Sequence, residues 1–80
     1  MRILNQGEDK SLNKVLLLLT IDEAIELRDE LERLLLQKNI NDHGHINDAN
    51  YAKELTLSLY EQNNISGFQK RIQKLIIEDI

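Results

Sequence analysis

The chain has 80 residues, of which 41% are hydrophobic and 30% charged, and its formal net charge at pH 7 is −4. This length allows one small domain over residues 1–80, and the lack of cysteine excludes disulfides and thiolate zinc sites. The acidic balance disfavours a nucleic-acid partner, because such proteins use a basic patch to bind phosphates.

One strand is expected in the first quarter of the chain, and whether residues 2–5 form another is left open. Residues 2–5 contain apolar side chains and precede a polar stretch in which Gly7 suits a turn. Residues 12–19 form an apolar run between polar residues, which favours a buried strand. If the two segments pair, they form an antiparallel hairpin.

A helix is expected from Ile21 to Gln37. Thr20 and Glu23 have the spacing of a capping box, in which each side chain bonds the backbone N–H of the other residue. Apolar residues then recur at spacings of three and four, and they form the expected buried stripe: Ala24, Leu27, Leu31 and Leu34.

A polar interruption over residues 39–50 is expected to be a loop, since Asn, Asp and Gly favour turns. Residues 53–60 follow as a strand, because leucines alternate there with Thr56, Ser58 and Tyr60. A second helix is expected after Ser66, which has the spacing of a capping residue, and it should run to the C-terminus; Asn64 is a competing cap.

These elements predict an α+β fold with the order (β)βαβα. We expect two layers, with two helices on one face of a small sheet of two or three strands. The register of residues 12–19 is open, because a slip of one residue exchanges the two faces of a strand. The expected core comprises Leu16, Leu18, Leu27, Leu31, Leu34, Leu55, Leu57, Phe68, Ile72 and Leu75.

The order of helix, histidine loop and alternating strand resembles a group of small bacterial proteins of unassigned function. In that group a helix of the pattern LTxEEAxELRDxLExLL precedes a His-containing loop and a strand similar to EITVxIY. The matching residues here are Leu19–Leu35, then His43 and His45, then Glu54–Tyr60. The resemblance implies this architecture and carries over no activity.

His43 and His45 are the candidate metal ligands, with Asp48 as a third. In an extended segment, residues two apart point to the same side, as a chelate requires. Asp42 or Glu54 could complete such a site for a divalent metal. The competing interpretation is a solvated polar loop without a cofactor.

No catalytic site is expected, and the protein is therefore predicted not to be an enzyme. The sequence has no nucleophile motif, no phosphate-binding glycine loop and no H-E-x-x-H pattern. The carboxylates of residues 22–32 are interleaved with Arg28 and Arg33, which is typical of a solvated helix face.

No basic start followed by an apolar segment is present, and the longest apolar run is Val15–Leu19, so we expect a cytoplasmic chain outside the membrane.

Association is the function that the sequence favours. Two short helices can cover only one face of a small sheet, and the other face would then expose apolar side chains. We expect a homodimer across this second face, whose interface residues are Val15, Leu17, Leu19, Thr56, Ser58 and Tyr60. The N-terminal segment or an unidentified protein partner could cover the face instead.

The predicted function is thus a small interaction module of the adaptor, immunity or phage-accessory type. The alternative is a metal-binding sensor or enzyme built on His43 and His45.

Overall fold

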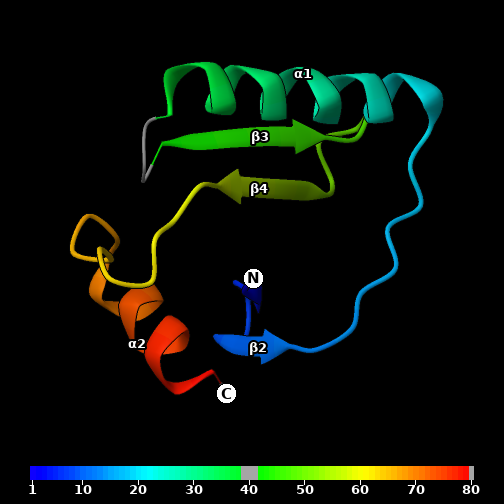
Figure 1. Ribbon diagram of the computed structural model, residues 1–80. Coiled ribbons are helices and arrows are strands. Elements are labelled where there is room, and N and C mark those ends of the chain that lie inside the picture. The colour runs from blue at the N-terminus through cyan, green and yellow to red at the C-terminus, as the bar shows by residue number, and fades with distance from the viewer. Residues whose placement is uncertain (39–41, 80) are drawn as a thin grey trace. The chain divides into compact units, whose positions relative to one another are not determined.

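The computed structural model describes residues 1–38 and 42–79. The chain divides into two compact units, one made of Met1–Leu17 with Gln62–Ile80 and the other of Leu18–Glu61. Figure 1 shows the elements, which follow one another as β1 (Ile3–Asn5), β2 (Lys10–Leu12), α1 (Ile21–Gln37), β3 (His43–Asn47), β4 (Glu54–Ser58) and α2 (Lys70–Glu78). The α+β class expected from the sequence is confirmed.

The unit formed by the two ends of the chain contains the β1–β2 hairpin and α2. The strands pair antiparallel, with Ile3 opposite Leu12 and Asn5 opposite Lys10. Asn5 shapes the turn between them, because its side-chain oxygen accepts hydrogen bonds from the N–H groups of Gly7 and Glu8. An antiparallel hairpin at the start of the chain is therefore present, but its second strand is Lys10–Leu12, which shares only Leu12 with the expected strand of residues 12–19.

Side chains connect this hairpin to α2. Arg71 donates hydrogen bonds to the Asp9 carboxylate at 2.7 Å and to the Gln6 carbonyl at 3.1 Å. Ser11 donates to the Asp79 carboxylate at 2.6 Å. The apolar side of α2 contributes Leu75 and Ile76 to the buried core.

The central unit consists of α1 and the β3–β4 hairpin. The capping box is confirmed: Glu23 donates its N–H to the Thr20 hydroxyl at 3.2 Å, and Thr20 donates its N–H to the Glu23 carboxylate at 2.9 Å. The helix ends at Gln37, and the next residue, Lys38, adopts the left-handed conformation and donates its N–H to the Leu34 carbonyl. Thus α1 has the bounds that the sequence predicts.

Thr20→Ala is expected to lower the free energy of unfolding by about 1 kcal/mol, because it leaves the first helical N–H groups without an acceptor. Thr20→Ser keeps the hydroxyl and should retain most of the stability. Urea unfolding of the three proteins measures the difference. Equal midpoints for wild type and Thr20→Ala would contradict the assigned cap.

The β3–β4 hairpin lies beside α1, with β3 nearer to the helix in Figure 1. The strands pair antiparallel in the register Gly44 opposite Leu57 and Ile46 opposite Leu55. Gly44 and Ile46 are buried, whereas His43 and His45 are exposed, so one face of β3 is covered. A Cβ atom on Gly44 would lie 2.7 Å from Glu30 Oε2 and 3.3 Å from Glu30 Cβ, which shows how closely α1 approaches this face.

Three sequence predictions about the elements are wrong. Residues 13–19 form no strand and follow β2 as an extended connection to α1, because Leu12 is the last residue that pairs with β1. Residues 43–47, expected to be a loop, form β3. Ser66 does not cap α2, which begins at Lys70 after Gln69 and has no side-chain cap.

The pairing also differs from the expected single sheet. The described residues form two separate two-stranded sheets, β1–β2 and β3–β4, rather than one sheet of two or three strands. The placement of both helices on one sheet face is not confirmed. The single domain over residues 1–80 stays a prediction.

The core is smaller than expected. The buried apolar side chains are those of Leu34, Ile46, Leu75 and Ile76, so Leu34 and Leu75 are confirmed and the two isoleucines were missed. The expected core residues that are only half-buried are Leu27, Leu55, Leu57, Phe68 and Ile72. Placing Leu16, Leu18 and Leu31 in the core was wrong, since these side chains are 80%, 84% and 40% exposed. The β3–β4 hairpin has only two strands, so it covers a narrower side of α1 than the spacing of apolar residues along the helix predicts.

Among residues 1–38 and 42–79, no helix is both long and apolar enough to cross a membrane.

Candidate functional site

The outer face of the β3–β4 hairpin carries both histidines. Strand alternation directs His43 and His45 away from the face on which Gly44 and Ile46 are buried. Their rings lie parallel, with centroids 6.2 Å apart and planes 5° from one another. The structure therefore brings the two predicted ligands together on one strand.

His45 belongs to a polar cluster across the two strands. Its Nδ1 lies 2.7 Å from Glu54 Oε1 and 3.2 Å from the hydroxyl of Thr56, the residue opposite it in β4. Thr56 also donates its hydroxyl hydrogen to Glu54 at 3.2 Å. These contacts fix the orientation of the ring, and they place Glu54 rather than Asp48 as the carboxylate at His45.

Asp48 has a structural task in the turn after β3. Its side-chain oxygen accepts hydrogen bonds from the N–H groups of Ala52 and Lys53, at 2.8 and 3.2 Å. Within the described part of the chain, no group of three or more histidine, aspartate or glutamate side chains is arranged to hold a metal ion. The predicted set of His43, His45 and Asp48 is thus brought together only in its histidine pair.

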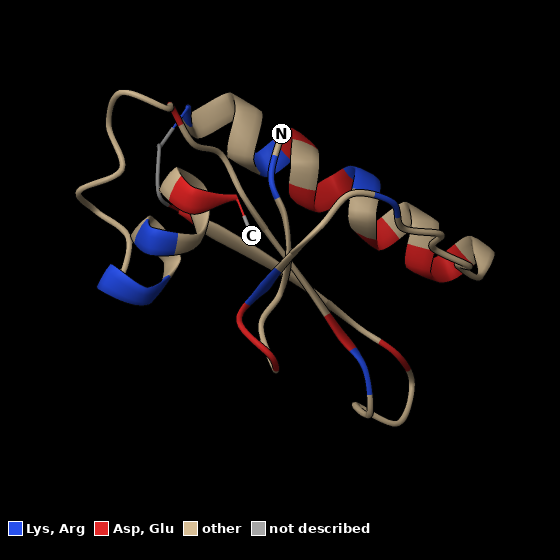
Figure 2. Ribbon diagram, turned by 90° about the horizontal axis from the view of Figure 1, so that it is seen from below, with Lys and Arg blue, Asp and Glu red and all other residues tan. Residues whose placement is uncertain are grey.

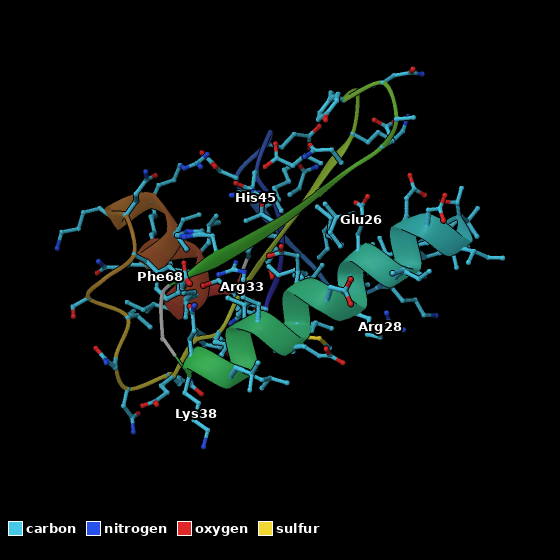
Figure 3. The ribbon with its side chains drawn as sticks, turned by 90° about the horizontal axis from the view of Figure 1, so that it is seen from above. Glu26, Arg28, Arg33, Lys38, His45 and Phe68 are labelled. Atoms are coloured by element: carbon cyan, nitrogen blue, oxygen red, sulfur yellow. The ribbon has the colours of Figure 1, made fainter. Side chains whose placement is uncertain are left out.

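Asp42, a further candidate ligand, binds Arg33 of α1 instead. Arg33 donates to the Asp42 carboxylate at 3.1 Å, to the Glu30 carboxylate at 2.9 Å and to the His43 carbonyl at 2.6 Å. Figure 3 shows Arg33 between α1 and the beginning of β3. Arg33, which the sequence assigned to a solvated helix face, points toward the hairpin instead.

The pKa of Asp42 lies below its ordinary value of 3.8, mainly because its carboxylate accepts a hydrogen bond from the His43 N–H. The ion pair with Arg33 lowers this pKa further, whereas partial desolvation of the carboxylate raises it. The carboxylates of Glu30 and Asp42 raise the pKa of Arg33 above its ordinary value. The cluster therefore joins α1 to β3 in the charged state.

The lowered pKa of Asp42 predicts acid-sensitive stability. The stabilising contribution is complete above the ordinary pKa of 3.8 and is lost as the pH falls through the lower folded value. Asp42→Asn should therefore be less stable than wild type at neutral pH, with the difference shrinking once the pH falls below 3.8. Thermal melts over an acid series measure this difference, and a pH-independent one would contradict the assignment.

A cleft of about 520 Å³ lies between the first turns of α1 and the turn after β3. Its lining is mostly polar and acidic, and Figure 3 shows Glu26 on α1 close to β3. The lining residues are Thr20, Asp22, Glu23, Glu26, His45, Asn47, Asp48, Ala49 and Tyr51. The sequence did not predict this cleft. The cleft depends on where the turn after β3 lies relative to α1, and the sequence assigned that turn and β3 to one irregular loop.

The predicted interface residues do not share a sheet face. Val15, Leu17 and Leu19 lie in the connection before α1, where they are partly exposed. Thr56 and Ser58 lie on β4, where Thr56 contacts His45 and Ser58 donates its hydroxyl hydrogen to the Asp42 carbonyl at 2.8 Å. Tyr60 follows β4 and is half-buried. The common face was wrong because residues 15–19 form no strand.

The outer side of α1 is apolar at both ends and charged in the middle. Side chains at positions 21, 25, 28, 32 and 35 follow spacings of four and three, so they line one side of the helix. All five are exposed, and we call them the outer stripe: Ile21, Ile25, Arg28, Glu32 and Leu35. Figure 2 shows basic and acidic positions of α1 close together along the helix.

Comparisons with family models, curated proteins and solved structures find no match.

Proposed function

We propose that this chain is a small cytoplasmic protein-interaction module that works as a homodimer and has no catalytic activity of its own. Such a module would act as an adaptor, an immunity protein or a phage accessory protein. The observation that carries the proposal is the exposure of several large apolar side chains, some in the connection before α1 and others on α1 itself. Contiguous apolar patches on small proteins mark interaction surfaces more often than free surface.

These side chains come from two stretches, each taken by itself. In the connection before α1, Leu16 and Leu18 are the most exposed leucines, although the sequence placed them in the core. On α1, the outer stripe exposes Ile21, Ile25 and Leu35. Association would bury such side chains, and two-fold symmetry is the commonest way in which identical chains associate.

Light scattering over a series of concentrations tests the proposal. We expect the mass to rise with concentration toward twice the chain mass of 9.3 kDa. Leu18→Lys should shift this rise to higher concentration, whereas Asn13→Lys, which adds the same charge at an exposed polar position, should leave it unchanged. A constant mass of 9.3 kDa into the millimolar range would overturn the homodimer.

The alternative function is a divalent-metal-binding protein, either a sensor or a metal-dependent enzyme. The parallel rings of His43 and His45, with Glu54 at His45, are the observation that favours it. Zinc titration of the untagged chain by calorimetry separates the two functions. The interaction module gives no heat above a buffer blank at micromolar protein, whereas saturable heat that disappears in His45→Ala would favour the metal site.

A further inference from the structure

The outer stripe of α1 has a charge order that is complementary to itself. Arg28 and Glu32 occupy its middle, with Ile25 on one side of them and Leu35 on the other. Position 30 is the midpoint both of 28 and 32 and of 25 and 35. When two copies of the helix lie antiparallel around a two-fold axis at this position, each Arg28 faces the other copy's Glu32, and each Ile25 faces the other copy's Leu35.

We propose that α1 pairs antiparallel with α1 of a second copy through the outer stripe. This inference rests on the proposed homodimer and names the surface and the orientation through which it forms. A parallel pair would place Arg28 against Arg28 and Glu32 against Glu32, whereas the antiparallel pair makes two identical ion pairs. Antiparallel helices also set their opposed macrodipoles side by side.

The exposed side chains suit this contact. Ile25 and Leu35 are 41% and 58% exposed, and in the antiparallel pair each Ile25 meets the other copy's Leu35 on either side of the central charges. This pair buries the apolar side chains while opposite charges meet, whereas a parallel pair would bring like charges together. The 17 residues of α1 extend over roughly 25 Å, which is enough for four turns to be in contact.

The central charges are accessible to a second chain. Arg28 contacts only its neighbour Asp29 among the described residues, through Nε and Nη2 at 3.3 and 3.2 Å, and its side chain is 63% exposed. A guanidinium has five N–H donors, so contact with Asp29 leaves donors for a carboxylate of the other copy. A purely apolar partner would leave Arg28 and Glu32 without opposite charges to contact. A second copy supplies both opposite charges, so it is the favoured occupant of the outer stripe.

Exchanging the two charges tests both the surface and the orientation. Arg28→Glu places like charges against each other twice in the antiparallel dimer, and so does Glu32→Arg. We expect each single variant to raise the dimer dissociation constant at least about tenfold, because the symmetry repeats every unfavourable contact. The double variant R28E/E32R restores opposite charges and should dimerise as wild type does.

Mixing the two single variants gives the sharpest result. An Arg28→Glu chain and a Glu32→Arg chain are complementary across the antiparallel contact, so an equimolar mixture should form a heterodimer that neither variant forms with itself. Circular dichroism of each variant confirms that α1 remains folded. Charge-driven recovery should weaken with added salt, because salt screens exposed pairs.

The outcomes separate this inference from the proposed function. A wild-type dimer that neither single variant weakens would overturn the α1 pairing and leave the homodimer standing. Recovery in the double variant without recovery in the mixture would show that the two charges act within one helix, and it would also overturn the pairing. A wild-type monomer at all concentrations would overturn both, and capture of a different protein by that monomer would assign the stripe to another partner.

Discussion

Replacing Leu34 by alanine is expected to lower the free energy of unfolding by about 2–5 kcal/mol, the usual cost of truncating a core leucine. Leu34 is the most deeply buried large side chain of the described residues, with no exposed surface. It lies one turn after Glu30, which approaches Gly44 of β3, so it shares the side of α1 that faces the β3–β4 hairpin. A domain of this size has a total stability near the low end of about 5–15 kcal/mol, so the loss is a large part of it.

Urea unfolding followed by circular dichroism measures this loss. Leu36→Ala is the matched control, because it removes the same atoms from a side chain that is 85% exposed. It should change the stability by no more than about 0.5 kcal/mol when both variants are diluted until they are monomeric. Similar losses for the two leucines would show that Leu34 is not the centre of this core.

Leu75→Ala should have an effect of similar size in the unit formed by the chain ends. The side chain of Leu75 is 3% exposed, and its truncation is expected to lower the stability by about 2–5 kcal/mol. Ile77→Ala, two residues further along α2 at an exposed position, should cost little. Melting curves of both variants give the comparison, and equal shifts would contradict the assigned apolar side of α2.

Hydrogen exchange of Leu34→Ala and Leu75→Ala also tests whether residues 1–80 unfold as one domain. One cooperative domain predicts that each variant accelerates the exchange of core amides in both units, since they open together. Acceleration confined to the unit that carries the substitution would show that the two units unfold independently.

The sequence predicted α1 in full because its signals are local. The capping box requires only Thr20 and Glu23 at the right spacing, and both hydrogen bonds are present. The alternation of leucines with Thr56 and Ser58 also predicted β4, although Leu55 to Ser58 are all half-buried and only its partner β3 shows one covered and one open face. Short-range patterns of this kind act within one element, and they do not depend on distant parts of the chain.

The failures occurred where distant contacts decide the structure. His43 to Asn47 contain Gly44 and polar residues, which favour a loop, but pairing with β4 makes them a strand. Gly44 is suited to β3 because Glu30 of α1 comes so near to it. The leucines before α1 have the composition of a buried strand, and they remain exposed because no strand pairs with them in the described residues.

The candidate site was predictable only in part. The spacing of His43 and His45 placed both rings on one side, which the structure confirms. The partners of these residues were not predictable, because Glu54 reaches His45 only through the register of β3 and β4. The role of Asp42 likewise depends on Arg33, which approaches from the helix.

Sedimentation equilibrium of the untagged wild-type chain tests the central claim, self-association through exposed apolar surface, most directly. The homodimer predicts one monomer–dimer equilibrium, with an average mass that approaches twice 9.3 kDa as the concentration rises. A single mass of 9.3 kDa at every concentration up to the millimolar range would contradict it.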